Sequence, residues 1–296
     1  MPKITVLIAA RNAEKTLAET LESLAAQTYT DFDVLLVDDE SSDGTQEVAN
    51  AFRSRLRLDL LRLDKNAGVA GALNHGLAQI QSDYIARLDA DDIALPTRLE
   101  KQAAFLDARS DVAVCGSWMD MFYDDASQNS RILAKPLEDA AIKTALVQYC
   151  SMSHGSSTFR RSFFQDVGVF DLRLDFAEDY DIWCRGALLG KQYANLPEAL
   201  TRYRQHGGQV GQQKRQLQYE RDLIIKRKYI SALLGGESSG NLAEFFSLLT
   251  MFTTRAIALQ VVQQSMPLLF KLGRKVYDEK LYSEIVAACI GRHLAA

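Results

Sequence analysis

The first 122 residues alternate short apolar runs of strand length with segments that carry a helical apolar stripe. Apolar runs of about five residues indicate buried strands, and apolar residues spaced three and four apart indicate the helices that cover them. The predicted strands span residues 4–9, 32–37, 58–63, 84–88 and 112–121, and the predicted helices lie at 14–26, from 43, at 69–80 and after Pro96. Short connections between such elements require right-handed crossovers. The pattern therefore predicts a Rossmann-like α/β fold, with a mainly parallel sheet flanked by helices.

The pattern is less regular after about residue 122 and becomes helical from residue 211 onward. In the middle part we predict helices at 138–149 and from 178, and strands at 154–160 and 199–204. The glycines at 235, 236 and 240 mark a break between C-terminal helices. We therefore divide the chain into residues 1–122, residues 123–210 and a C-terminal helical subdomain at 211–296.

Composition excludes several classes of protein. The chain of 296 residues carries 34 Lys and Arg against 38 Asp and Glu, so the net charge of −4 argues against a partner that is a nucleic acid. The four cysteines are far apart and form no CxxC pair, which indicates free thiols rather than a zinc site or a disulfide framework.

The most apolar late stretch, 245–262, is interrupted by Thr253, Thr254 and Arg255 and is too short to span a membrane. We expect a cytoplasmic protein.

A basic stretch at 214–228 holds six Lys and Arg residues against Glu220 and Asp222. A charge run of this kind is usually a solvated helix face. The alternative is a patch that meets anionic lipid or a lipid-linked substrate, which would make the protein peripheral at the inner face of the cell membrane. The sequence leaves this alternative open, as it does the oligomeric state.

The strongest chemical feature is Asp89-Ala90-Asp91-Asp92, directly after an apolar strand. Carboxylates this close repel one another, and a divalent cation such as Mn²⁺ or Mg²⁺ would relieve the repulsion while bridging to substrate phosphates. Asp89 and Asp91 lie two apart, so they point the same way in an extended segment. The alternative is an exposed acidic turn that caps the helix near Pro96.

A second acidic segment, Asp38-Asp39-Glu40-Ser41-Ser42-Asp43, also follows an apolar strand and opens a helix. Helix capping accounts for Ser41, Ser42 or Asp43 but requires neither Asp38 nor Asp39. A carboxylate at the carboxyl end of a parallel strand can accept hydrogen bonds from a nucleobase or a ribose. This segment therefore predicts a nucleotide site.

These motifs resemble, in order, the family-two glycosyltransferases of GT-A fold. The resemblance also uses Ile4-Thr-Val-Leu-Ile-Ala-Ala-Arg-Asn, Asn66-Ala-Gly, Asn74-His-Gly, Arg160-Arg161, Ala177-Glu-Asp-Tyr-Asp-Ile-Trp and Tyr203-Arg-Gln-His. It covers roughly residues 3–210, with a nucleotide-sugar-binding half at 1–122 and an acceptor-binding half at 123–210. It implies that a sugar moves with inversion from a nucleotide-sugar, with a UDP-sugar favoured, to a hydroxyl of a glycan or lipid-linked acceptor in cell-surface polysaccharide biosynthesis.

The resemblance also implies roles for individual residues. Asp179 matches the general base, while Asp91, Asp89 and His206 match the metal site. The positions implied to bind the nucleotide-sugar are Ala9, Arg11, Asp39, Asn66, Arg87 and Asp89. Candidate contacts to acceptor or donor are His154, Glu178 and Trp183, although a large aromatic side chain on a helix is more often part of the core.

Two positions depart from the family pattern. Arg11 stands where many members have a tyrosine that stacks on the base, and a guanidinium plane can stack in its place. Glu40 stands where glycine is usual, so a positive φ at this position would strain the backbone.

Two other functions were weighed. A sugar-nucleotide pyrophosphorylase needs a Gly-rich N-terminal loop, and Ala9-Ala-Arg-Asn is not Gly-rich. A non-catalytic nucleotide-sugar-binding protein would not need a metal site and a base together. Both alternatives are therefore weaker than the transferase.

Overall fold

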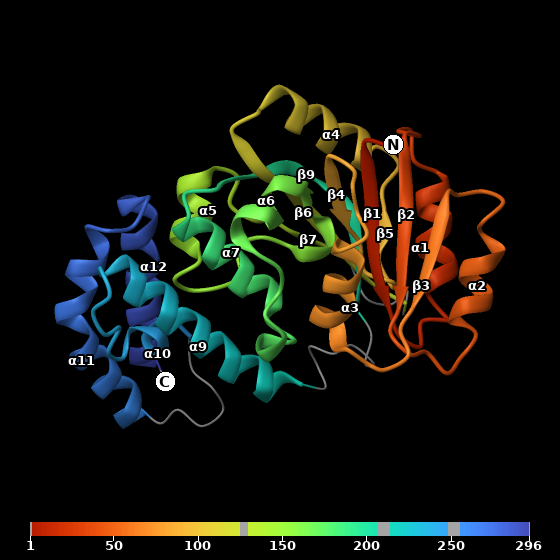
Figure 1. The fold of residues 1–296 in the computed structure, drawn as a ribbon. Coiled ribbons are helices and arrows are strands. Elements are labelled where there is room, and N and C mark those ends of the chain that lie inside the picture. Colours follow the sequence, from red (N-terminus) through yellow and green to blue (C-terminus); the bar gives the residue numbers. More distant parts are fainter. Residues whose placement is uncertain (1, 125–129, 206–213, 248–254, 296) are drawn as a thin grey trace.

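A mixed nine-stranded sheet forms the centre of the protein, in the order β3-β2-β1-β4-β8-β6-β9-β5 with β7 paired to β6 (Figure 1). The structure, a computed structural model, describes residues 2–124, 130–205, 214–247 and 255–295. The strands are β1 (Ile4–Ala10), β2 (Phe32–Asp38), β3 (Leu58–Arg62), β4 (Tyr84–Arg87), β5 (Ile93–Ala94), β6 (Val112–Tyr123), β7 (Arg131–Leu133), β8 (Thr158–Arg160) and β9 (Gln192–Gln205).

Helices surround the sheet and continue beyond it. Those of the first 190 residues are α1 (Leu17–Ala25), α2 (Thr45–Ala51), α3 (Gly68–Leu77), α4 (Arg98–Ala108), α5 (Asp139–Ala145), η1 (His154–Ser156), α6 (Arg161–Val167), η2 (Leu172–Leu174) and α7 (Glu178–Leu188). The C-terminal helices are α9 (Arg215–Leu233), α10 (Leu242–Ser247), α11 (Arg255–Gly273) and α12 (Glu279–Ala295).

Strands β3, β2, β1 and β4 run parallel, as the alternating pattern predicts. The second half adds β8 antiparallel to β4, β6 antiparallel to β8, and β9 parallel to β6. The short strands β5, β7 and β8, with two or three residues each, make the antiparallel pairs. Because β1, β2 and β4 are parallel neighbours, their carboxyl ends lie at the same edge of the sheet.

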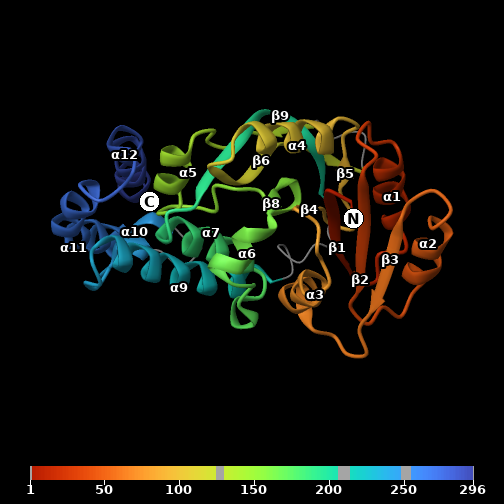
Figure 2. The same cartoon turned by 45° about the horizontal axis from the view of Figure 1, so that its top comes forward.

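Two apolar cores lie on opposite faces of the sheet (Figure 2). One core joins the sheet to α1, α2 and α4, for example through Leu21, Ala49 and Leu99. The other joins it to α3, α6 and α7, and it continues into the C-terminal helices through Tyr229 and Phe245. The helical extension therefore packs on the same core as α6 and α7.

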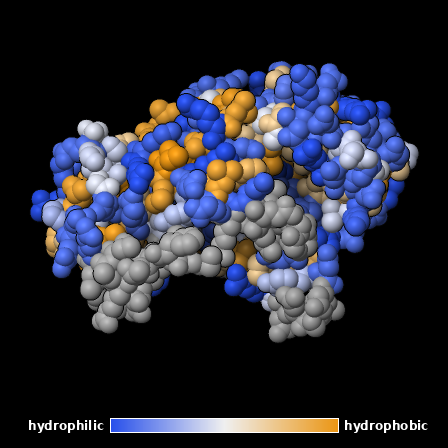
Figure 3. Space-filling view, turned by 90° about the horizontal axis from the view of Figure 1, so that it is seen from below, coloured by the Kyte–Doolittle hydropathy of each residue, from blue (hydrophilic) through white to orange (hydrophobic). Residues whose placement is uncertain are grey.

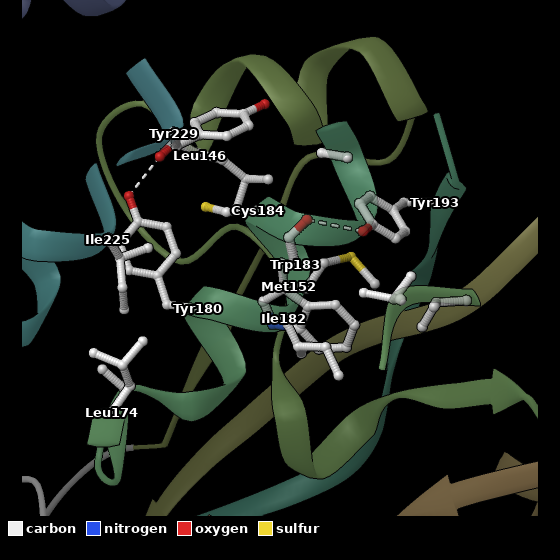
Figure 4. Close-up of a cluster of buried hydrophobic side chains, with 14 of the residues drawn as sticks. Leu146, Met152, Leu174, Tyr180, Ile182, Trp183, Cys184, Tyr193, Ile225 and Tyr229 are labelled. Atoms are coloured by element: carbon white, nitrogen blue, oxygen red, sulfur yellow. Dashed lines mark hydrogen bonds between the residues drawn. The ribbon is translucent and has the colours of Figure 1, made fainter. Parts of the chain in front are cut away.

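Tyr180, Trp183, Tyr193 and Tyr229 lie among aliphatic side chains in the second core (Figure 4). The Trp183 ring stacks on Phe159 at a centroid distance of 5.2 Å. The buried hydroxyls are satisfied, because Tyr193 donates to the Trp183 carbonyl at 2.9 Å and Tyr180 donates to the Leu146 carbonyl. Such partners keep buried polar groups from destabilising the core.

The C-terminal part is helical, as predicted, with its break at the positive-φ glycines Gly235, Gly236 and Gly240. Within the described ranges, no helix combines the length and the apolar character that crossing a bilayer requires.

Gly186 is a test of this packing. Alanine normally stabilises a helix interior relative to glycine by about 0.5–1 kcal/mol. A Cβ on Gly186 would lie 2.8 Å from Phe163 and still closer to the Tyr193 hydroxyl, so we expect Gly186→Ala to lower the free energy of unfolding. Overpacking of this kind typically costs about 1–3 kcal/mol.

The matched control is Gly291→Ala on α12, where a Cβ would meet nothing within 4 Å. Urea denaturation should show this variant equal to or more stable than the parent chain. Equal stabilisation by both substitutions would contradict the close approach of α7 to β9.

Candidate active site

The carboxyl edge of the parallel strands gathers the predicted nucleotide-binding residues. Asp39 follows β2, and its amide donates to the carbonyl of Ala10 at the end of β1. Its carboxylate accepts from the amides of Ala67 and Gly68 at 2.6 and 3.1 Å and from Asn66 Nδ2 at 3.1 Å. Burial raises the pKa of Asp39, and the hydrogen bonds from Ala67 and Gly68 act against that rise.

Arg11 belongs to the same corner. It is exposed directly after β1, and its charge also acts to lower the pKa of Asp39. Ala9 precedes it on β1, opposite Val37. The structure thus brings together Ala9, Arg11, Asp39 and Asn66, four of the residues that the resemblance implies.

Glu40 has φ +60, the left-handed conformation that glycine adopts without strain. The strain expected from the sequence is therefore present. Its carboxylate accepts from the Asn66 amide at 3.1 Å, which ties the segment after β2 to the start of α3. A glycine at this position could not make that bond.

The start of α3 is held by a second carboxylate that the sequence did not single out. Asp175 accepts from the Ala70 amide at 3.1 Å. Gly68 has φ +73, and a Cβ there would lie 2.6 Å from Asp175 Oδ2. Asp175 comes from the segment before α7, so the two halves of the chain meet at this helix start.

The acidic motif after β4 is partly buried and heavily bonded. Arg87 pairs with Asp89 at 2.5 Å and also donates to the Leu88 carbonyl. Asp92 is fully buried and accepts from the Arg204 amide of β9 at 3.0 Å. Its second oxygen has no partner among the described residues. Burial, reinforced by Asp89 and Asp91, raises the pKa of Asp92 well above its usual range.

The donor set fits a hard divalent cation. Gly155 packs against the motif so closely that a Cβ would lie 2.7 Å from Asp89 Oδ2 and 3.0 Å from Asp92 Oδ2. Carboxylate oxygens are the ligands that Mg²⁺ and Mn²⁺ prefer. The parts of the chain that the structure describes hold no group of three or more His, Cys, Asp or Glu side chains arranged around one ion. His206, predicted to complete the site, lies outside the described residues.

The acid pair Glu178-Asp179 begins α7. Asp179 accepts from its neighbour's amide, Tyr180 N, at 2.7 Å and from Cys150 Sγ at 3.4 Å. Burial raises the pKa of Asp179, and the bonds from Cys150 and Tyr180 lower it in part. The negative charge of Asp89 also acts to raise the pKa of Asp179, so the two acidic motifs interact electrostatically.

The turn at His154-Gly155 lies between the two acidic motifs. Gly155 contacts Asp89 and Asp92, and His154 Nδ1 lies 3.9 Å from Glu178 Oε1. Burial and the nearby Arg87 lower the pKa of His154 well below 6.5, so this imidazole is neutral at pH 7. His154 packs against Phe170 and Trp183 at centroid distances of 5.2 and 6.2 Å.

Trp183 is fully buried. Of the two interpretations that the sequence left open, the structure supports a core residue and leaves Trp183 no surface for an acceptor. The reason is that α7 turns this side chain towards Phe159 and Tyr193 rather than towards the acidic motifs.

Sequence reasoning missed the residues that support the site. Gly155 and Asp175 act through long-range contacts that no local pattern predicts. The buried Arg98 donates to the Arg87 carbonyl at 2.5 Å, and burial lowers the pKa of Arg98 to about 10. A charged residue in the apolar stripe of α4 was the only available signal.

A mixed sheet with carboxylates at its parallel edge and an acidic helix start beside them is the arrangement expected of a glycosyltransferase of GT-A fold. The family model Glycosyl transferase family 2 matches residues 5–168, and the chain belongs to this family.

Relatives and solved structures agree with that assignment. The chain is 30% identical to the amylovoran biosynthesis glycosyltransferase AmsE of Erwinia amylovora over 88% of this chain and 96% of that one. It is 27% identical to the Escherichia coli UDP-Glc:alpha-D-GlcNAc-diphosphoundecaprenol beta-1,3-glucosyltransferase WfaP, over 72% of this chain and 82% of that one. It is similar in fold to S. aureus TarS 1-349 in complex with UDP-GlcNAc, with a TM-score of 0.66 and 20% identity over 99% of this chain and 89% of that one. It spans 54% of the longer TarS chain. The protein is thus a family-two glycosyltransferase.

Glu178 gives the site a pH-dependent stability. Burial and the neighbouring Asp179 raise the pKa of Glu178 from 4.5 to about 8, so the folded protein holds a proton there that the unfolded chain releases above pH 4.5. The stability contributed by this proton is fully present below pH 4.5 and is lost as the pH rises through about 8. Glu178→Gln should therefore be more stable than the parent chain at pH 9, by about 1 kcal/mol or more.

Denaturant unfolding at pH 5 and pH 9 measures this difference. At pH 5 the two proteins should differ little, because the neutral acid and the amide have similar shapes. The exposed Glu47→Gln on α2 is the control and should follow the parent at both values. A gain in Glu178→Gln that did not change with pH would exclude the buried proton.

Proposed function

We propose that the protein transfers a sugar from a nucleotide-sugar, in the first place a UDP-sugar, to a hydroxyl of a lipid-linked or growing glycan, with inversion and with help from a divalent cation. The observation that carries this proposal is the His154-Gly155 turn, which brings Asp89 and Asp92 next to the Glu178-Asp179 pair. A donor-binding edge beside a candidate base is what a direct displacement at the anomeric carbon needs.

Asp39 and Arg11 suit the nucleoside. A carboxylate has about four acceptor positions, and Asp39 uses three of them on Asn66, Ala67 and Gly68. The remaining one can accept from an N–H of the base or a ribose hydroxyl. The exposed guanidinium of Arg11 can stack on the base.

Asp89 and Asp91 would hold the cation, and Arg87 lies beside them next to Asp89. When bound, a divalent cation offsets the negative charge that develops on the leaving diphosphate. The Arg87 guanidinium, bonded to Asp89, would place positive charge beside the diphosphate.

Asp179 is the proposed base. As the acceptor oxygen bonds to the anomeric carbon, Asp179 takes its proton, and the bond from that carbon to the diphosphate breaks. The nucleoside diphosphate leaves on the opposite face, so the configuration inverts. A raised pKa makes Asp179 a stronger base than an exposed aspartate, while it stays ionised above that pKa.

The relatives support the substrate classes. WfaP is named for UDP-Glc and for a diphosphoundecaprenol acceptor, and TarS was solved with UDP-GlcNAc. The named function of AmsE is amylovoran biosynthesis. We place the reaction in the cytoplasm, in keeping with the free thiols of all four cysteines.

Donor and cation are tested together by thermal stabilisation with UDP-, GDP- and dTDP-sugars, each with and without Mn²⁺. A ligand at about 100 times its Kd should add about 2.7 kcal/mol to the free energy of unfolding. We expect the largest stabilisation with a UDP-sugar plus Mn²⁺, and loss of the Mn²⁺-dependent part in Asp91→Asn. The exposed Asp83→Asn, at the opposite end of β4, is the control. Unchanged Mn²⁺ dependence in Asp91→Asn would remove Asp91 from the cation site.

The base is tested with Asp179→Asn. Loss of a general base typically lowers the rate about 10²- to 10⁴-fold. We expect this loss in sugar transfer with donor stabilisation unchanged, because Asp179 lies on α7 rather than at the edge of β1 and β2. Transfer by Asp179→Asn at a tenth of the parent rate or better would show that another group takes the proton. If the parent chain bound the donor but transferred no sugar, the result would favour a non-catalytic binding protein.

A further inference from the structure

Five exposed aliphatic side chains gather on one face of the molecule, over the segment after α6 and over α7 and α9. Figure 3 shows apolar groups over the middle of this face. We call this set the apolar patch: Val169, Leu172, Leu188, Leu189 and Ile224. Leu172 and Leu189 are 60% and 58% exposed, so they are largely in water.

The end of α7 is bonded to the segment after α6, which brings Val169 near Leu188 and Leu189. The Arg185 guanidinium donates to the carbonyls of Val167 and Val169 at 2.6 and 2.8 Å. Leu188 and Leu189 lie within the next turn after Arg185. Leu172 follows Val169 by three residues, at the start of η2.

Ile224 joins the apolar patch through α9. The Arg221 guanidinium lies 5.3 Å from the Phe176 ring centre. Arg173, with a smaller contribution from Lys228, lowers the pKa of Asp171 to about 2, so Lys228 lies near η2. Residues three and four apart share a helix face, which places Ile224 on the face of α9 that carries Arg221 and Lys228 and that meets the segment of Phe176.

Positive charge borders the apolar patch. Residues 214–228 hold six Lys and Arg against two acidic residues, a net charge of 6 − 2 = +4. Lys226 and Asp222 face inward, and burial raises the pKa of Asp222 to about 6. The exposed Lys228 and the partly exposed Arg221 remain on the side of the apolar patch. Arg173 on η2 has a side chain that is 84% exposed, but its charge is paired with Asp171 at 2.7 Å, so the cationic border consists of the α9 side chains.

The composition indicates lipid rather than protein as the partner. Protein interfaces are anchored by Trp, Tyr and Arg, and Leu and Val are under-represented at their energetic centres. The apolar patch is wholly aliphatic. Long Lys and Arg side chains beside exposed leucines are typical of surfaces that lie in a bilayer interface and attract anionic headgroups.

The apolar patch also borders the candidate active site. Leu172 precedes Asp175 by three residues, and Asp175 bonds the start of α3. Phe176, with φ +78, then leads into Glu178 and Asp179. A surface that rests on the apolar patch would lie next to the acid pair.

We infer that the apolar patch and the cations of α9 form a docking surface for an anionic lipid bilayer, which presents a lipid-linked acceptor to Asp179. The presentation of the acceptor rests on the proposed function, because only a lipid-linked acceptor requires the enzyme to lie on a membrane. Binding to the bilayer itself needs neither donor nor transfer.

The test is flotation of the full chain with vesicles of phosphatidylcholine alone or with 30% phosphatidylglycerol. We expect binding to the anionic vesicles that weakens with salt. Leu172→Ser with Leu189→Ser should weaken it at least tenfold, and Lys228→Glu should also weaken it. Phe270→Ser on α11 removes a side chain that is 73% exposed and far from the apolar patch in sequence; it is the matched control and should bind like the parent chain.

Donor stabilisation separates this inference from the proposed function. A chain that binds a UDP-sugar but no vesicle overturns the docking surface alone, and a chain that binds vesicles but no donor overturns the transferase proposal alone. Equal loss of binding in Phe270→Ser would overturn the assignment to the apolar patch. The assignment would also be overturned if the chain did not bind vesicles but formed a concentration-dependent dimer that the double substitution Leu172→Ser and Leu189→Ser abolished.

Discussion

One physical constraint governs the site: its carboxylates lie in a partly dehydrated place, which costs free energy that the rest of the fold must offset. Asp39, Asp92, Glu178 and Asp179 have raised pKa values because of burial, and each lies at the edge where the two halves of the chain meet. A buried charge needs a partner, and here the partners are backbone amides, a thiol and arginines. Perturbed acids that gather at one edge of a sheet are typical of functional sites. The strands and helices around this edge hold the four carboxylates in place.

Much of this was predictable where the signal is local. The parallel strands followed from apolar runs, and the parallel arrangement then required Asp39 and Asp89 to share an edge. Asn66 and Asp39 were implied by the family resemblance and are directly bonded. The sequence also raised the possibility of strain at Glu40, and the structure shows both the strain and the Asn66 bond that accompanies it.

The rest depends on long-range contacts. Strand β8 lies within the strand predicted at 154–160, but no local signal shows that it pairs antiparallel with both β4 and β6. The sequence allowed Asp92 to belong to an exposed acidic turn near Pro96, whereas the structure buries it against the Arg204 amide of β9. Gly155 carries no pattern at all, since its role is the space that it leaves for two carboxylates. These properties arise only when distant segments have met.

The packing of α9 against α7 bears on how such enzymes can be recombined. The family model ends at residue 168, but the acid pair follows it on α7. Gln218 of α9 donates to the Phe176 carbonyl at 3.1 Å, and Tyr229 donates to the Lys143 carbonyl at 2.9 Å. A crossover placed after residue 205 would pair an α7 from one parent with an α9 from another and break this contact. Chimaeras that exchange the helical extension would have to inherit α5 and α7 together with it, so these segments behave as a single heritable module.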